Sequence, residues 1–319
     1  MLLAGLYVGS KNPNQMVFLQ PFFEEALNKL SSLGFVWIHD EKEVVSKVIP
    51  LCGVTDSVAR YQLLNMQSFH AFYGCTFCYE KQEKTGPRSK CFNVLSERAN
   101  ERTAESTYQD AKRAYERKNE SRIDKRHWKG VKGPSVLMNL QYFDLIWGFV
   151  IDYMHAILLG VIKCHMEYLF DSTKKKCWID MTNRVSLKNL TDTIDSRLLS
   201  IQPPSGINRS PRSIEHCCKW KASEWRSWLL FYCIPCLQGL LKDKYLAHLA
   251  MLSQETYILL QRSVSCTEIE EVHNLFLQYC YYFQKYFIPK HTIYNLHLLI
   301  HVCKCVINWG PLCSVYTGG

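Results

Sequence analysis

The spacing of the hydrophobic residues changes part-way along this chain, and that change most constrains its fold. Residues 2–8 form an apolar run typical of a buried strand, and residues 16–33 repeat apolar side chains at intervals of three and four, as an amphipathic helix does. A second strand-like run follows at 44–54. From about residue 182 to 286 the helical spacing continues, broken mainly by prolines. The pattern predicts an α/β part followed by an all-α part.

Composition places the chain among globular proteins. Hydrophobic residues make up 47% of the 319 residues, which excludes a disordered, collagen-like or coiled-coil chain. Lys and Arg number 38 and Asp and Glu 29, so the net charge is +9 and nucleic acid is the first partner to consider. No apolar run reaches the roughly 18 residues of a membrane span, and no basic residue precedes the first apolar run, so we expect neither a membrane helix nor a signal peptide.

The fifteen cysteines favour a reduced environment. Their number is odd and many lie within apolar helical runs, which argues against a disulfide framework and for thiols packed in a core. We therefore expect an intracellular protein, with the nucleus as its location.

The organisation along the chain predicts five segments. The stretch 81–130 is rich in Lys and Arg, and its centre is polar and compatible with a helix. The predicted segments are 1–80 (α/β core), 81–130 (basic helical linker), 131–170 (junction between core and insertion), 171–290 (helical insertion) and 291–319 (start of a final core helix).

Two pairs of residues have the spacing of zinc ligands. Cys75 and Cys78 offer two sulfurs in a short turn, which is half of a tetrahedral site. His297 and His301 are four residues apart, so both imidazoles lie on one helix face. Together they would make a Cys₂His₂ site that ties the first segment to the last. The alternative is an ordinary turn with free thiols and two packed histidines.

Three further residues are candidates for catalysis. Asp56 follows the apolar run 44–54, at the strand end where open α/β sheets place their chemistry, but Asp is also a favoured helix N-cap. Asp152 and His155 interrupt a very apolar stretch, where ionisable groups need a partner or a function. They form either a hydrogen-bonded core pair or part of an active site.

The candidate nucleic-acid contacts are basic and aromatic. Trp225 and Arg226 belong to an aromatic-cationic cluster suited to stacking bases, although core packing on an amphipathic helix is the alternative. Lys112 and Arg113 lie in the basic stretch, whose alternative interpretation is a solvated surface. Arg60, four residues after Asp56, completes this set.

Six short sequence blocks follow one another along nearly the whole chain. They are TDSVAR at 55–60, NMQSFHAFYGCTFC at 65–78, GVKGPS at 130–135, DYMH at 152–155, KASEWRSW at 221–228, and NLHLLIH at 295–301, followed by WGPL at 309–312. In the same order these blocks resemble the CACTA-like (En/Spm) cut-and-paste DNA transposases of metazoan genomes, and six ordered blocks are far more specific than any one of them.

This resemblance implies a partial RNase H-like core with a large helical insertion, and an Asp-Asp-Glu triad that holds two Mg²⁺ or Mn²⁺ ions. Asp56 then corresponds to the second carboxylate of the triad, with Asp152 as the rival, and Asp152 with His155 matches the family's Asp-x-x-His motif beside the active site. The Cys and His pairs resemble the zinc-binding pairs of the related V(D)J recombinase catalytic subunit. The implied partners are transposon-end DNA, held in part by the insertion around Trp225 and Arg226, and further copies of the chain.

The chain also departs from the family pattern. The strand that carries the first catalytic Asp and the helix that carries the Glu have no counterpart, so we expect a truncated protein of the DDE class without strand-transfer activity. One alternative is a zinc-stabilised module for binding DNA or protein, retained after loss of catalysis. Another is a product without a stable fold, because a core lacking strands exposes a sheet edge.

Overall fold

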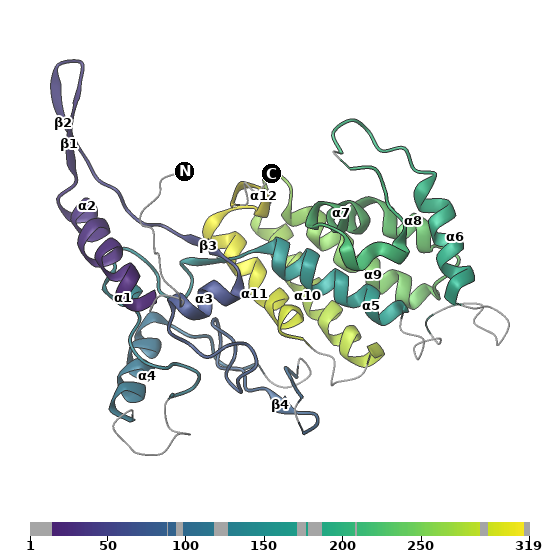
Figure 1. Ribbon diagram of the computed structural model, residues 1–319, viewed down its shortest axis with the longest axis horizontal. Coiled ribbons are helices and arrows are strands. Elements are labelled where there is room, and N and C mark those ends of the chain that lie inside the picture. Colours follow the sequence, from purple (N-terminus) through teal and green to yellow (C-terminus); the bar gives the residue numbers. More distant parts are fainter. Residues whose placement is uncertain are drawn as a thin grey trace, which may run out of the picture. The chain divides into compact units, whose positions relative to one another are not determined.

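The computed structural model describes residues 15–87, 89–93, 98–117, 127–170, 177, 187–207, 209–287 and 293–315. Its fold is mixed α/β and rich in helix, as predicted, with small two-stranded sheets (Figure 1). The chain forms two compact units. The first comprises Met1–Lys90 with Glu97–Ile151, and the second comprises Cys91–Ser96 with Asp152–Gly319. The strand predicted at residues 2–8 lies outside the described residues.

Among the described residues, the first element of the first unit is the predicted amphipathic helix. The helical stretch ends at Gly34, whose φ of +76° is the left-handed conformation that glycine adopts most easily. A side chain there would also collide with the backbone carbonyl of Ser46. The stretch consists of α1 (Gln15–Gln20), the π-helical segment η1 (Pro21–Leu27) and α2 (Asn28–Ser32).

The run predicted as one strand at 44–54 forms parts of two different sheets. β1 (Phe35–His39) and β2 (Lys42–Ser46) pair as an antiparallel hairpin that extends away from α2 in Figure 1. β3 (Gly53–Thr55) pairs in parallel with β6 (Phe149–Ile151). Pro50 separates β2 from β3, because proline has no N–H group to continue a strand ladder.

The rest of the first unit consists of short elements around a buried core. α4 lies inside the polar stretch that was predicted to permit a helix, and it buries Ala111 and Ala114 while its other faces carry charged residues. The core includes Tyr61, Phe77 and Leu145. The elements are α3 (Ser57–Leu63), β4 (Glu83–Lys84), β5 (Lys90–Cys91), α4 (Ala104–Arg117) and the 3₁₀ turn η3 (Val136–Asn139).

Apart from Cys91, which ends β5, the regular elements in the described part of the second unit are helices joined by loops. α10 packs against both α9 and α11, and η4 packs against α11. No helix in the described ranges has the length and apolar character that crossing a bilayer requires. The elements are η4 (Met154–Ile162, π-helical), α5 (Lys163–Phe170), α6 (Leu187–Leu199), η6 (Ile214–Lys219, 3₁₀), α7 (Ala222–Ser227), η7 (Trp228–Tyr232, π-helical), α8 (Cys233–Leu237), α9 (Asp243–Leu259), α10 (Cys266–Phe287), α11 (Tyr294–Trp309) and α12 (Leu312–Val315).

The boundary between the units falls inside the segment 131–170, which the sequence analysis expected to be the junction between core and insertion. The chain changes unit between Ile151 and Asp152. The physical reason is that β6 bonds to β3 in the first unit, whereas η4 packs against α11 in the second. Hydrophobic spacing cannot detect this switch because both sides of it are equally apolar.

Candidate metal centre

The first half of the centre is the turn that carries Cys75 and Cys78. Both residues are buried, and the backbone N–H of Phe77 donates to Cys75 Sγ at 3.4 Å. Gly74 precedes the turn, and a Cβ atom at this position would lie 2.8–2.9 Å from the backbone of Phe69, so only glycine fits there. A hydrogen bond with the Cys75 thiol, together with burial, raises the pKa of Cys78. Without a cation the Cys78 thiol therefore stays protonated, and a bound metal ion would reverse this by stabilising the thiolate.

The buried side chain of Arg102, which belongs to the first unit, stabilises this turn. Its Nε donates to the carbonyl oxygens of Cys75 and Cys78, at 3.0 and 3.1 Å. The guanidinium also pairs with the buried Asp110 at 3.7 Å and stacks over the Tyr79 ring at 4.2 Å. Arg102 is fully buried, so these contacts hold the turn and its sulfurs in place. Sequence reasoning missed Arg102, because no motif or spacing links it to the two cysteines.

The second half of the centre lies on α11 in the second unit. His297 and His301 are buried, and their Nε2 atoms face each other at 3.3 Å. The ring of Phe92 stacks on that of His297, with centroids 4.1 Å apart and planes 11° apart, and this fixes the imidazole orientation. Two nitrogens bound at 2.0–2.1 Å to one tetrahedral zinc ion lie about 3.3 Å apart, so the observed separation suits two ligands of one ion.

The four ligand side chains form one group. One sulfur or ring nitrogen from each of Cys75, Cys78, His297 and His301 lies within 4.8 Å of every other, and all four residues are buried. Two thiolates and two imidazoles are a donor set that zinc prefers in structural sites. The group could therefore hold a metal ion such as zinc.

The candidate acidic residues follow the two strands of the parallel sheet. Asp56 comes directly after β3 and caps α3, with its Oδ1 accepting from the backbone N–H of Ala59 at 2.7 Å. Asp152 comes directly after β6, and its Oδ1 accepts from the N–H of Met154 at 2.9 Å. Its Oδ2 lies 2.5 Å from Nδ1 of His155. The capping role considered for Asp56 is present. Asp152 and His155 are paired as considered, but His155 is exposed, so the pair does not lie in the core.

The candidate DNA contacts divide into exposed and buried residues. Lys112 and Arg113 are exposed on α4, and the Arg113 guanidinium lies 5.5 Å from the centroid of the Trp128 ring. Arg60 and Trp225 are each only 1% exposed. Arg60 packs on the Phe77 ring at 4.8 Å, and Trp225 contacts the Trp220 ring edge-on, so both lie where a phosphate or base would not reach them directly.

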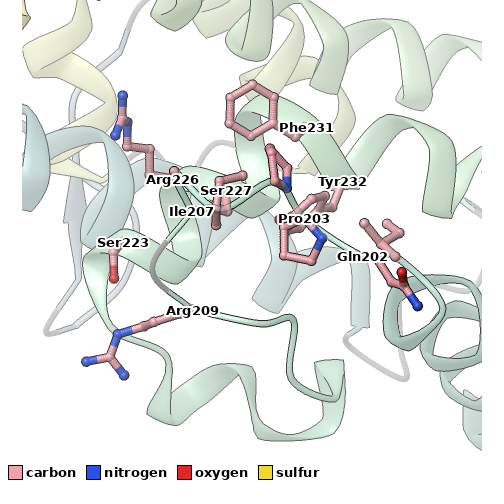
Figure 2. A pocket seen from close by; sticks show the side chains of 12 residues that line it. Gln202, Pro203, Ile207, Arg209, Ser223, Arg226, Ser227, Phe231 and Tyr232 are labelled. Atoms are coloured by element: carbon pink, nitrogen blue, oxygen red, sulfur yellow. The ribbon is translucent and has the colours of Figure 1, made fainter.

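Arg226 is exposed and lines a pocket of about 580 Å³ in the second unit (Figure 2). One wall is the proline-containing loop around Pro203, and the other is formed by α7 and η7, including Phe231. In Figure 2 the guanidinium groups of Arg209 and Arg226 point away from each other, so they do not converge on one ligand group. The pocket therefore offers an apolar wall with separate cations at its rim.

A second buried polar group in the second unit was also missed by sequence reasoning. Its members are His165 on α5, His248 and Glu255 on α9, and Tyr279 on α10. Nδ1 of His165 lies 2.8 Å from the Tyr279 hydroxyl, and Nε2 of His248 lies 2.9 Å from the Tyr279 carbonyl oxygen. Burial raises the pKa of Glu255 to about 9 and lowers that of His248 to about 4. All three ionisable side chains are therefore neutral at pH 7, because burial, with His248 nearby, also lowers the pKa of His165.

Comparison with known proteins adds no family to this picture: neither the protein-family models nor the curated proteins searched contain a match to this chain.

Proposed function

We propose that this chain is a transposase-derived protein of the DDE class with a partial RNase H-like core. Its parent reaction is metal-dependent cleavage and transfer of DNA strands at transposon ends. The proposal rests on the ordered motifs described above, which resemble CACTA-like transposases, and on the position of two of their acidic residues.

The observation that carries the proposal is the register of the parallel strand pair. Thr55 in β3 is the partner of Ile151 in β6, so the next residue along each strand is an aspartate, Asp56 on one and Asp152 on the other. Carboxylates at the ends of adjacent parallel strands are what a divalent cation needs in metal-dependent phosphoryl transfer. This register favours the interpretation that both Asp56 and Asp152 derive from catalytic residues over the interpretation that only Asp56 does.

The two carboxylates fit part of such a site. Mg²⁺ or Mn²⁺, when bound, would stabilise the attacking and leaving oxygens of a phosphodiester. Asp56 and Asp152 would each offer carboxylate oxygens, and His155 orients the Asp152 carboxylate through its short contact with Oδ2. In the part of the chain that the structure describes, neither Asp56 nor Asp152 belongs to a group of three or more side chains close enough to bind one metal ion. We therefore expect weak cation binding and no strand transfer by this chain alone.

Cation binding and DNA nicking test this proposal together. Wild-type protein, its Cys/His group loaded with zinc, should bind Mn²⁺ weakly by electron paramagnetic resonance titration, and both Asp56→Asn and Asp152→Asn should abolish that binding. Supercoiled plasmid should stay intact in Mg²⁺ or Mn²⁺. Nicking that disappears in Asp56→Asn would overturn the expected inactivity, and an unchanged Mn²⁺ titration in both variants would remove the aspartates from any metal site.

The second candidate function is a zinc-stabilised module that binds DNA or a protein after loss of catalysis. The buried Cys₂His₂ group favours it, because a metal ion there would serve folding and not chemistry. Both candidates share the zinc site, and they differ in whether the aspartates bind a cation.

Elemental analysis of the purified chain tests the zinc site. We expect one tightly held zinc per chain, lost in both Cys75→Ser and His297→Ala. The matched controls are Cys52→Ser and His39→Ala, because both of these residues are exposed and lie outside the ligand group. Equal zinc content in the ligand variants and in the controls would contradict the proposed ligand set.

A further inference from the structure

Three lysine side chains converge on one aromatic ring in the first unit. The Nζ atoms of Lys90, Lys81 and Lys84 lie 4.3, 5.8 and 5.9 Å from the centroid of the Phe72 ring. Since all three nitrogens lie within 5.9 Å of one point, no two of them can be farther apart than about 12 Å. We call these three residues the lysine cluster.

The lysine cluster is held by a small hairpin. β4 and β5 pair, and between them the backbone N–H of Thr85 donates to the Ser89 carbonyl at 3.1 Å while the two hydroxyls lie 3.0 Å apart. Nζ of Lys90 donates to the carbonyl oxygen of His70 at 3.0 Å. The half-buried Lys90 is therefore fixed, and the exposed side chains of Lys81 and Lys84 extend the positive charge into solvent.

The cluster carries more positive than negative charge. Of the two carboxylates in the same stretch, Glu80 accepts from the backbone N–H of Ala99 at 3.3 Å. Glu83 lies beside Lys84 in β4. Three ammonium groups gathered near one ring repel one another, and an anion placed among them would relieve that repulsion. The arrangement of the three ammonium groups therefore favours binding of a negatively charged partner.

We infer that the lysine cluster binds the phosphate backbone of duplex DNA. This inference rests on the proposed function, which supplies DNA as the partner, and it adds a contact surface at the start of the basic stretch 81–130, separate from the candidates Lys112 and Arg113. One strand of duplex DNA carries a phosphate about every 3.4 Å along the axis, so 12 Å spans about three to four phosphates. Three ammonium groups within that upper limit can contact up to three phosphates of one strand.

The composition of the cluster favours DNA over an acidic protein. Lysine is depleted at protein–protein interfaces, whose centres are apolar, whereas DNA-binding surfaces are strongly positive. Here the one aromatic ring, Phe72, is only half-exposed and lies under ammonium groups, so it offers no open apolar centre. Lysine ammonium groups act as flexible point charges, which predicts binding without sequence preference.

The test measures DNA affinity by fluorescence anisotropy with full-length, zinc-loaded protein and two unrelated 20-base-pair duplexes. We expect the variant Lys81→Gln/Lys84→Gln/Lys90→Gln to bind both duplexes on the order of 100-fold more weakly at 100 mM salt. The slope of log K against log salt concentration should fall by about 3, since each lost phosphate contact contributes about 0.9. The charge-retaining variant Lys81→Arg/Lys84→Arg/Lys90→Arg should keep wild-type affinity.

The matched control removes three exposed lysines from the second unit, Lys188→Gln/Lys219→Gln/Lys242→Gln, and should change affinity less than fivefold. Wild-type binding with an equal loss in the cluster variant and the control would overturn the inference and leave the proposed function standing. A wild-type protein that binds no DNA would instead remove the DNA partner of the proposed function. Equal competition by polyglutamate would assign the cluster to acidic proteins.

Discussion

The second unit contains two pairs of buried histidines, and the difference between them separates candidate metal ligands from core side chains. His297 and His301 face each other with Nε2 atoms 3.3 Å apart and have two buried thiols within ligand distance. His165 and His248 are equally buried, but each has a protein partner in Tyr279. Burial of histidine alone therefore does not indicate a metal site. The surroundings of the ring nitrogens decide.

The pair His165 and His248 belongs to a group that also contains a buried carboxylic acid, Glu255. Neither carboxyl oxygen of Glu255 has a hydrogen-bond partner in the described part of the chain, and Glu255 is fully buried. A carboxylate in such a place is costly, so the side chain holds a proton and not a cation. The Cys/His group offers four potential ligands to a metal ion. The His165–His248–Tyr279–Glu255 group instead contains side chains whose pKa values are shifted by burial.

Zinc removal should have the largest effect and act on only one of the two groups. We expect chelation to lower the free energy of unfolding by about 4 kcal/mol relative to protein in zinc at one thousand times its dissociation constant. Urea unfolding with and without chelator measures this. The Cys78→Ser variant should be insensitive to chelator, and the Tyr279→Phe variant should respond as the wild type does. If chelation left the free energy of unfolding of the wild-type protein unchanged, His297 and His301 would not differ from His165 and His248 in metal binding.

The Glu255→Gln substitution should give the next largest effect, through pH. The pKa of Glu255 is about 9 in the folded chain and near its ordinary value of 4.5 when unfolded, so the folded state binds the proton more tightly. The resulting stabilisation is complete below pH 4.5 and is lost as pH rises towards 9. We expect the variant to gain stability over the wild type by about tenfold in the folding equilibrium constant for each pH unit between 6 and 9.

Urea unfolding of both proteins in this pH range, with zinc saturating, checks the prediction, because the difference between them cancels the pH dependence of zinc binding. The control is Glu271→Gln on the exposed face of α10, which should follow the wild type. Parallel curves for Glu255→Gln and the wild type would show that the carboxylate titrates normally.

The two groups were not equally visible in the sequence. Spacing of three between cysteines and of four between histidines indicated the four members of the candidate metal centre, because each half is local and has a recognisable geometry. His165, His248 and Tyr279 come from three helices and share no motif, so only packing brings them together. The same limit explains Arg102, which reaches the Cys75 turn through tertiary contacts.

Local sequence patterns predicted where helices lie better than they predicted which side chains of those helices are buried. The helix at 16–33 followed from apolar spacing, whereas the aromatic-cationic pattern around Trp225 left base stacking and core packing as alternatives, and the structure buries that ring. Amphipathic periodicity does not say which face of a helix is covered when both faces carry aromatic residues, as in 220–228.

Replacement of His248 by glutamine should reduce acid sensitivity. Burial lowers the pKa of His248 to about 4, so the folded chain binds this proton less tightly than the unfolded chain does. The stabilisation is complete above pH 6.5 and is lost as pH falls towards 4. His248→Gln should therefore lose less stability than the wild type between pH 6.5 and 4.5, while zinc content at pH 7 stays unchanged. Thermal unfolding across this range, followed by circular dichroism, measures the difference.

The smallest effect should come from Tyr279→Phe, and it provides the sharpest separation of the two groups. The substitution removes the hydroxyl that lies 2.8 Å from Nδ1 of His165 and keeps the ring that stacks on His248 at 4.3 Å between centroids. Leaving a buried ring nitrogen without its partner costs about 1 to 3 kcal/mol, so urea unfolding should show a loss in this range. Zinc stoichiometry should remain one per chain, because Tyr279 is outside the ligand group. Loss of zinc in this variant would mean that the two histidine pairs depend on one another and that hydrogen bonding around Tyr279 positions α11 for its ligands.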